Sequence, residues 1–192
     1  MKKKTSVNID AETYTYLHGV HVPRRLYELT EIYFIKNAPT IDIGSGCGRD
    51  TSWLNQSGFP CIGIEPVDGL RNEAVNEFPK YTFIKSSLPN LREIESSKFN
   101  NVFICNVLMF VPVQDIIVSV MNLLRITATS GRIIISIGNG LAEKDGKTIE
   151  SYHPDRIAQL FEHLKGTILL IEKQTSVINL VIEKDEERFK PA

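Results

Sequence analysis

Short apolar runs alternate with stretches of helical spacing along most of this chain. The runs at 41–43, 59–64, 81–85, 102–105 and 132–137 are rich in β-branched and aromatic residues and are bounded by glycine, proline or polar residues. Runs of this length and composition predict the buried strands of a mostly parallel sheet. Because the segments between them have helical periodicity, the pattern predicts an α/β fold with helices on both faces of the sheet.

The helices are predicted from apolar positions three and four residues apart. They are expected at about 11–18, 23–37, 50–56, 68–78, 90–94, 115–125 and 155–165. Two β-rich runs at 167–172 and 176–184, separated by a short polar turn, predict a C-terminal hairpin. The inward-facing positions include Leu26, Leu29, Ile32 and Tyr33 in the second helix and Ile116, Ile117, Val120, Leu123 and Leu124 in the sixth.

The segment 40–50, TIDIGSGCGRD, joins a predicted strand to a predicted helix through three glycines, Gly44, Gly46 and Gly48. Glycine suits such a turn because it adopts positive φ and lets a ligand lie against the backbone. The spacing differs from the dinucleotide fingerprint G-x-G-x-x-G, since Arg49 occupies the place of the third glycine. Asp42 lies two positions before the first glycine, which gives the pattern D-x-G-x-G-x-G.

This pattern resembles the first motif of the class I S-adenosylmethionine-dependent methyltransferases, in which the loop lies against the methionine part of the cofactor. The resemblance covers nearly the whole chain. The segments 42–53, 65–66, 87–89 and 138–143 are similar to a subgroup of small bacterial-type methyltransferases with mostly unassigned substrates. The resemblance implies S-adenosyl-L-methionine as cofactor and a doubly wound, mostly parallel seven-stranded sheet with an antiparallel C-terminal hairpin.

Glu65 follows the second predicted strand directly, 19 residues after Gly46, where a doubly wound fold places the acid that accepts hydrogen bonds from ribose hydroxyls. The alternative is a solvated acid in a turn. Relatives also carry an acid at 86–87 that meets the adenine amine, whereas this chain has serines there. The serines either contact the cofactor or cap the helix expected at 90–94. The cofactor-binding residues implied by the resemblance are Asp42, Gly44, Ser45, Gly46, Gly48, Glu65, Pro66, Ser87, Leu88, Asn106 and Val107.

The acceptor side of the site is expected after the fourth strand and in the segment 138–154. By the resemblance, Asn106 points into the site, while Asn100 and Phe110 replace an Asp and a His that are common in relatives. The chain lacks the Asp/Asn-Pro-Pro-Tyr/Phe stretch of enzymes that methylate adenine or amide nitrogen in nucleic acid or protein. The polar candidates on the substrate side are Asn139, Lys144, Lys147, Tyr152 and His153, with Tyr14, Tyr16, His18 and His21 in the N-terminal segment.

No residue stands out as a catalytic base. An amine nucleophile needs only to be neutral, whereas a hydroxyl gains from proton removal as it attacks. The weak candidates for that role are His153, His18 and His21. Each has an ordinary alternative, because histidines often face water and His153 directly precedes Pro154 at the expected start of a helix.

A chain of 192 residues is of a size that buries one hydrophobic core, and it contains no repeat or linker. We therefore expect a single domain over 1–192. By the resemblance, 1–38 form a helical lid, 39–185 a Rossmann-like core and 186–192 a charged tail.

The composition of the chain limits the kinds of molecule that it is expected to bind. A net charge of −1 argues against nucleic acid as a partner, and no apolar run of about 18 residues is present to span a membrane. Three cysteines without regular spacing predict neither disulfides nor a metal site. We expect a cytoplasmic enzyme that methylates an O or N atom of a small molecule, with the oligomeric state left open. The alternatives are a cofactor-binding protein without turnover and a nicotinamide-dependent oxidoreductase.

Overall fold

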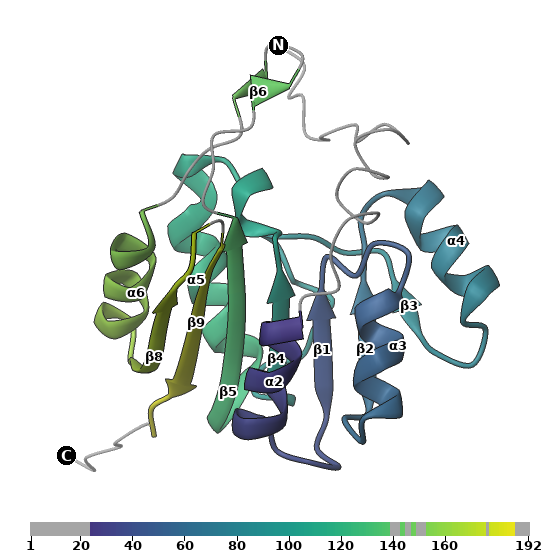
Figure 1. Ribbon diagram of the computed structural model, residues 1–192, viewed down its shortest axis with the longest axis horizontal. Helices are drawn as coiled ribbons and strands as arrows, with labels where there is room; N and C mark the ends of the chain where they lie inside the picture. Colours follow the sequence, from purple (N-terminus) through teal and green to yellow (C-terminus); the bar gives the residue numbers. More distant parts are fainter. Residues whose placement is uncertain (1–23, 139–142, 145–146, 149–152, 176, 187–192) are drawn as a thin grey trace.

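Seven strands form one sheet in the order β3-β2-β1-β4-β5-β9-β8 in the computed structural model of the chain (Figure 1). The structure describes residues 24–138, 143–144, 147–148, 153–175 and 177–186. The first five strands in this order are parallel, and β9 is antiparallel to both β5 and β8. The strands of the sheet are β1 Thr40–Ile43, β2 Cys61–Ile64, β3 Phe83–Ile84, β4 Phe99–Cys105, β5 Thr127–Gly138, β8 Gly166–Lys173 and β9 Val177–Lys184.

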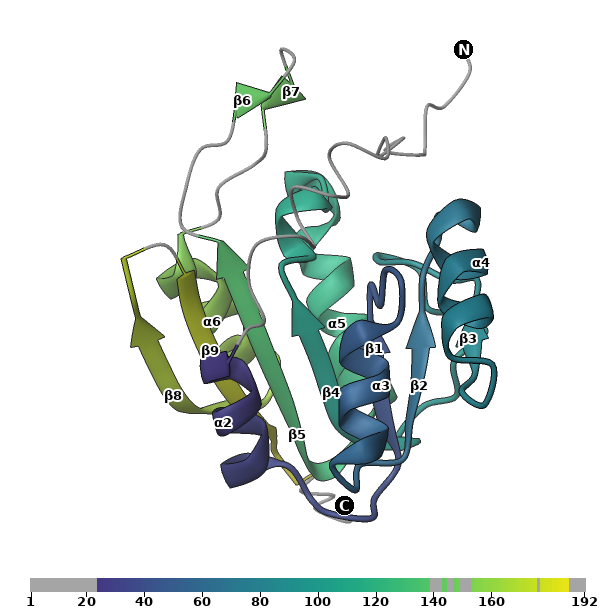
Figure 2. The same cartoon turned by 45° about the vertical axis from the view of Figure 1, so that its right-hand side comes forward.

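Helices cover both faces of this sheet, as Figures 1 and 2 show. On one face lie α2 and α3, and on the other lie α5 and α6. The strands β6 (Glu143–Lys144) and β7 (Lys147–Thr148) are two residues long and pair with each other. The helices are α2 Arg24–Tyr33, α3 Arg49–Gln56, α4 Asp68–Glu77, α5 Ile116–Ile126 and α6 Pro154–His163, with short 3-10 helices η1 Leu108–Phe110 and η2 Val113–Asp115.

The apolar core consists of two clusters separated by the sheet. In β5, Ile133 and Ile135 belong to the cluster under α5 and α6, whereas Ile134 belongs to the cluster under α2 and α3. This division follows from the strand period of two, which sends successive side chains to opposite faces. Because both faces are covered, all four residues of β1 are buried. The predicted sheet, with its C-terminal antiparallel hairpin, is confirmed.

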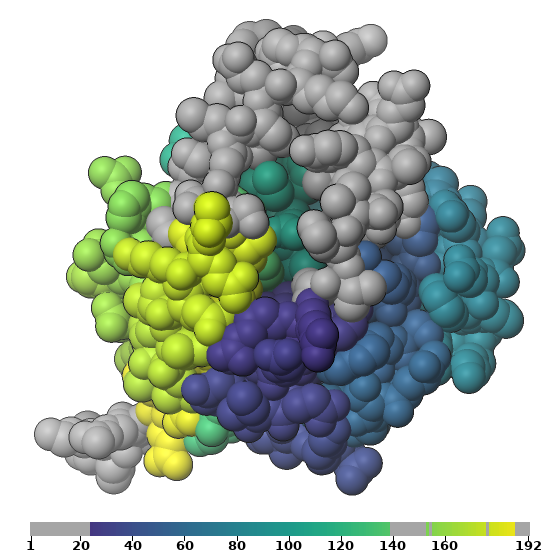
Figure 3. Space-filling view, viewed as in Figure 1, coloured from purple at the N-terminus to yellow at the C-terminus, as the bar shows by residue number. Residues whose placement is uncertain are grey.

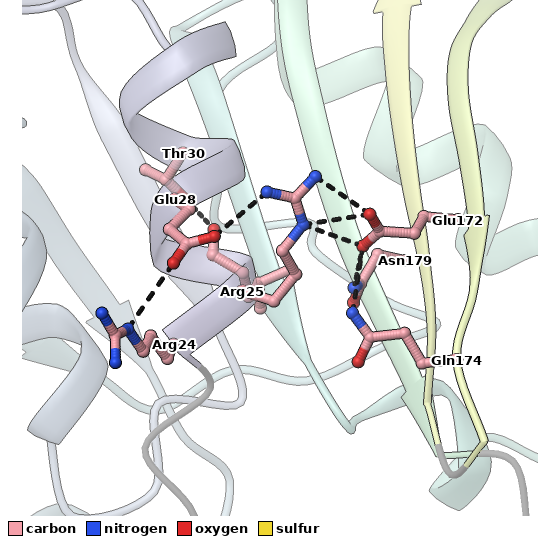
Figure 4. Close-up of polar contacts among 8 residues, drawn as sticks. Arg24, Arg25, Glu28, Thr30, Glu172, Gln174 and Asn179 are labelled. Atoms are coloured by element: carbon pink, nitrogen blue, oxygen red, sulfur yellow. Dashed lines mark hydrogen bonds and ion pairs between the residues drawn. The ribbon is translucent and has the colours of Figure 1, made fainter.

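Polar contacts attach both ends of helix α2 to the sheet, and Figure 4 shows those near its start. Near its start, the Arg25 guanidinium contacts the Glu172 carboxylate of β8, with Nε 3.0 Å from both oxygens. Beyond its end, the buried Asn101 side chain accepts a hydrogen bond from the Ile35 N–H and donates one to the Ile35 carbonyl, both at 2.9 Å. In the space-filling view α2 lies between α3 and the β8–β9 hairpin (Figure 3).

The same Asn101 contact explains why the second helix is shorter than expected. The sequence predicts a helix to about residue 37, but α2 ends at Tyr33. Because the backbone groups of Ile35 are bonded to Asn101, they are not used in a further helical turn. The prediction that Ile32 faces inward was wrong, since its side chain is 65% exposed.

Two further expectations were wrong. Residues 90–94 form turns instead of a helix, and the Arg125 guanidinium donates hydrogen bonds to the carbonyls of Leu91 and Ile94. A side chain of α5 thus satisfies backbone groups that a helix would have satisfied internally. Ile117 is 52% exposed, because it lies beside the buried stripe formed by Ile116, Val120, Leu123 and Leu124.

Candidate functional site

The glycine loop follows β1 at the edge of the sheet where the parallel strands end, uppermost in Figure 1. Gly44, Gly46 and Gly48 all have positive φ, at 75°, 54° and 84°. A Cβ on Gly44 would lie 2.4 Å from Cγ2 of Val107, the second residue after β4. A larger residue at 44 would therefore require both an unfavourable backbone conformation and displacement of Val107.

The loop is anchored to the neighbouring strand β2 by its backbone. The N–H groups of Gly44 and Ser45 both donate to the carbonyl of Ile64, each at 2.9 Å. The Ser45 hydroxyl oxygen is buried and lies against Gly63, where an added Cβ would be 2.7 Å from it. The side chain of Ser45 is thus packed against β2, and its backbone shapes the loop.

Glu65, the residue after β2, is buried and bonds to the glycine loop through its carboxylate. Oε2 accepts a hydrogen bond from the Gly46 N–H at 3.0 Å, and Oε1 accepts one from the Val67 N–H at 2.8 Å. Burial raises the pKa of Glu65, and the two backbone hydrogen bonds oppose that rise. A solvated turn acid, the ordinary alternative, is wrong for Glu65, whereas Pro66 beside it is exposed.

Asp42 lies beneath the loop. Its side chain is buried and accepts a hydrogen bond from the Thr51 hydroxyl of α3 at 2.7 Å. Burial, reinforced by the negative charge of Asp50, raises the pKa of Asp42 to about 8. The first acid of the sequence motif therefore connects β1 to α3 below the glycines.

A network that the sequence did not predict lies beside the loop. Arg49 contacts both carboxylate oxygens of Asp50, at 2.8 and 3.1 Å, and the Tyr27 hydroxyl donates to Asp50 Oδ1 at 2.5 Å. The Tyr27 ring stacks on Trp53 with centroids 3.8 Å apart and an angle of 5° between the planes. No local pattern connects Tyr27 with residues 49–53, so periodicity could not have revealed this contact.

Two residues of the segment after β4 face different neighbours. Val107 packs against Gly44, as described above. Asn106 has a φ of 55°, and its N–H donates to the Ser136 carbonyl of β5 at 2.9 Å. Its side-chain Oδ1 is buried and has no hydrogen-bond partner among the residues that the structure describes.

The serines after β3 differ from each other in exposure. Ser86 is buried and its hydroxyl donates to Glu93 at 3.1 Å, whereas Ser87 is exposed. Leu88 is partly buried against the core under α5. The suggestion that a serine caps a helix at 90–94 was wrong, because the described chain forms turns there.

Of the three candidate histidines, the structure describes His153, whose side chain faces solvent. The His153 side chain is 66% exposed, and its Nδ1 lies 3.4 Å from Asp155. Its carbonyl accepts the Arg156 N–H of α6, so His153 serves as the residue before that helix. Lys144 and Lys147 belong to β6 and β7. The candidates Tyr14, Tyr16, His18, His21, Asn139 and Tyr152 lie outside the described residues.

The described part of the chain contains neither a candidate membrane-spanning helix nor a candidate metal site. None of the helices there is long and apolar enough to cross a membrane. Over the same ranges, no three His, Cys, Asp or Glu side chains are grouped so that they could hold a metal ion.

A doubly wound α/β fold with a glycine loop after β1 and an acid after β2 defines a class of proteins that bind a nucleoside-containing cofactor. Residues 41–135 match the family described as a methyltransferase domain. The chain belongs to the class I S-adenosylmethionine-dependent methyltransferases; it is an enzyme of this class, and S-adenosyl-L-methionine is its cofactor. The predicted family and cofactor are confirmed, which argues against the nicotinamide alternative.

Solved structures of low sequence identity share the fold. The PH0226 protein of Pyrococcus horikoshii is 14% identical, with a TM-score of 0.74 over 93% of this chain and 94% of its own. A methyltransferase of Methanosarcina mazei described as SAM-dependent is also 14% identical, with a TM-score of 0.74 over 84% and 99%. The 1,6-didemethyltoxoflavin-N1-methyltransferase of Burkholderia thailandensis, with bound 1,6-didemethyltoxoflavin and S-adenosylhomocysteine, is 14% identical, with a TM-score of 0.72 over 85% and 78%. No match is found among curated protein sequences.

Proposed function

We propose that the protein transfers the methyl group of S-adenosylmethionine to an O or N atom of a small molecule by in-line displacement. The observation that carries this proposal is the contact between Glu65 and the glycine loop, which places a buried carboxylate beside a backbone cradle. Positive φ at its three glycines, and the close approach of Val107 to Gly44, support a loop that presents bare backbone to a ligand.

The residues of the site fit the cofactor. Each carboxylate oxygen of Glu65 has lone pairs beyond those used by Gly46 and Val67, so the carboxylate can also accept hydrogen bonds from ribose hydroxyls. Asp42 acts indirectly by fixing the loop to α3 through Thr51. The remaining proposed contacts come from the edges of neighbouring strands, namely Ser45, Gly48, Pro66, Ser87, Leu88, Asn106 and Val107.

The cofactor supplies a methyl group that is already activated by its bond to a positive sulfur. The protein must therefore mainly align the acceptor atom, at roughly 3–3.5 Å and opposite the sulfur. A small-molecule acceptor is supported by the Burkholderia neighbour, which binds 1,6-didemethyltoxoflavin. A cytoplasmic location without a nucleic-acid partner stays a prediction from composition.

We also propose that residues 1–38 act as a lid on the core formed by 39–185. The described part of that segment, α2, contacts the loop side of the site through Tyr27 and Asp50. This hydrogen bond and the stack of Tyr27 on Trp53 support a segment that lies beside the glycine loop.

Calorimetric titration of S-adenosylmethionine and S-adenosylhomocysteine tests the cofactor site. We expect micromolar binding to the wild type. Glu65→Gln should weaken both ligands by about 10- to 100-fold, because the amide group replaces one carboxylate oxygen with a donor. Gly44→Val should abolish binding, because its side chain would meet Val107.

The control for charge is Glu73→Gln, which alters an exposed carboxylate of α4 and should leave both affinities unchanged. Thermal unfolding of each variant without ligand shows whether it is folded. Absence of binding by the folded wild type would refute the proposed function.

A further inference from the structure

A row of polar side chains crosses four neighbouring strands on the face of the sheet that α2 covers. Strand register places these residues side by side, namely Cys105 of β4, Ser136 of β5, Asn179 of β9 and Glu172 of β8. Residues two positions apart in a strand share a face, and the neighbouring row on this face is apolar. That row belongs to the cluster under α2 and α3 and consists of Phe103, Ile134, Val181 and Leu170. All four strands therefore change from apolar to polar at the same level.

The polar row begins beside the proposed cofactor site and extends away from it. Cys105 is the last residue of β4, the neighbour of β1 and its glycine loop. Ser136 is two residues before the end of β5, and its carbonyl accepts the Asn106 N–H. In Figure 3 the surface is set back above α2 and beside the β8–β9 hairpin, where teal atoms from the middle of the chain are visible. Because ligands of open α/β sheets bind at the ends of the parallel strands, the row is placed to contact one.

Asn179 is a buried member of this row whose amide group is only half used. The residue is 2% exposed, and its Nδ2 donates to Glu172 Oε2 at 3.2 Å. Its Oδ1 is buried and has no hydrogen-bond partner among the described residues. By contrast, Asn55 and Asn101 use both the oxygen and the nitrogen of their side chains. Leaving a buried oxygen unpaired is costly, so the Asn179 oxygen is suited to a donor that arrives with a ligand.

Glu172 determines which end of the Asn179 amide is left unpaired. Its carboxylate is held by Arg25 of α2, whose Nη2 lies 2.9 Å from Oε1 (Figure 4). Hydrogen bonds from Arg25 lower the pKa of Glu172, which keeps the carboxylate ionised at neutral pH. An ionised carboxylate only accepts hydrogen bonds, so the NH₂ end of the Asn179 amide must face it and the oxygen must point elsewhere. The oxygen is thus oriented before any ligand binds.

We infer that Asn179 Oδ1 accepts a hydrogen bond from the methyl acceptor, which therefore carries an N–H or O–H group at a position other than the methylated atom. This inference rests on the proposed function, because the row meets a methyl acceptor only if the cofactor binds at the glycine loop. The contact selects among acceptors, since a molecule without this donor would leave the oxygen unpaired. Ser136 lies opposite Asn179 on the same face and extends the polar surface that the molecule meets.

Asn179→Leu tests first whether the amide serves the fold. Leucine is similar in size and removes an unpaired polar atom, so the midpoint of thermal unfolding of the ligand-free protein should stay unchanged or rise. Asn101→Leu is the matched control, because it removes a buried asparagine that is bonded to Ile35 and Thr40. It should lower the midpoint by roughly 3–10 °C. An equal fall for Asn179→Leu would show that Asn179 is structural and would overturn the inference.

NMR of isotope-labelled protein saturated with S-adenosylhomocysteine tests binding. The probes are benzamide with N,N-dimethylbenzamide, and phenol with anisole, because the second member of each pair lacks the donor. Benzamide and phenol should shift the side-chain amide signals of Asn179, which are identified by their loss in Asn179→Leu. They should bind about 3- to 10-fold more tightly than their methylated counterparts. The side-chain signals of Asn55, whose amide is bonded at both ends, should not move.

The variant distinguishes this contact from general affinity for the probes. Asn179→Leu should bind both members of each pair equally and keep the wild-type affinity for S-adenosylhomocysteine. Three results would each overturn the inference while the cofactor site stands: equal binding within the pairs by the wild type, no response of Asn179 to any of the four probes, or a preference that persists in Asn179→Leu. If the folded wild type does not bind S-adenosylhomocysteine, the proposed function itself fails.

Discussion

At the scale of single residues, Asp42 predicts an unusual dependence of stability on pH. Burial raises the pKa of Asp42 from 3.8 to about 8. Between these values the folded protein holds a proton that the unfolded chain releases, so the free energy of unfolding falls as pH rises. An asparagine side chain in its place would stay neutral at every pH. The free energy of unfolding of Asp42→Asn, relative to that of the wild type, should therefore increase as pH rises from 5 to 8, as measured by urea unfolding.

Asp68→Asn is the control for this experiment. Hydrogen bonds from Lys85 and Arg71 lower the pKa of Asp68 to about 2, so this exposed carboxylate is ionised throughout the range in both states. Its difference from the wild type should be constant with pH. A constant difference for Asp42→Asn as well would show that Asp42 is already ionised at pH 5.

At the scale of elements, α2 depends on Tyr27 for its contact with α3. Tyr27→Phe removes the hydrogen bond to Asp50 but keeps the stack on Trp53, and should cost about 1–2 kcal/mol of stability. Tyr27→Ala removes both contacts. Trp53 is the single tryptophan of the chain, so its fluorescence reports on this pair. We expect emission to shift to longer wavelength in Tyr27→Ala and to stay nearly unchanged in Tyr27→Phe.

Tyr33→Phe provides the comparison on the same helix. Tyr33 is half-buried, and its hydroxyl forms no hydrogen bond with the described residues. Removing the Tyr33 hydroxyl should lower the free energy of unfolding by less than removing the Tyr27 hydroxyl does. Equal losses from the two substitutions would contradict a specific role for the Tyr27–Asp50 contact.

At the scale of the whole molecule, the two core clusters share the same central strands. Ile133 and Ile135 of β5 belong to one cluster and Ile134 to the other, so neither cluster can separate without disrupting this strand. We propose a single domain on this basis. Scanning calorimetry should show one transition with equal calorimetric and van't Hoff enthalpies, shifted upward as a unit by S-adenosylhomocysteine. Two transitions, of which the ligand shifts only one, would disprove it.

The sequence alone determined the sheet and the glycine loop at which we propose the cofactor binds. The hydrophobic period and the glycine spacing depend only on residues close together in the sequence. They can therefore be recognised without knowing which distant residues are in contact. Gly44, Gly46 and Gly48 and the acid at 65 were predicted in this way, and the structure brings Glu65 onto the Gly46 N–H. The predicted C-terminal hairpin is present for the same reason.

Only the tertiary structure decided which side chains meet across long separations. Asn101 binds the backbone of Ile35, 66 residues earlier, just beyond the end of α2. Arg125 binds backbone carbonyls in the segment 90–94, which forms turns instead of the expected helix. Tyr27 of α2 donates a hydrogen bond to Asp50 of α3. The tertiary structure also left the Asn106 side-chain oxygen buried without a hydrogen-bond donor among the described residues. Local patterns specify which elements form, whereas these contacts depend on how the elements pack, and packing determines the chemistry at the edge of the sheet.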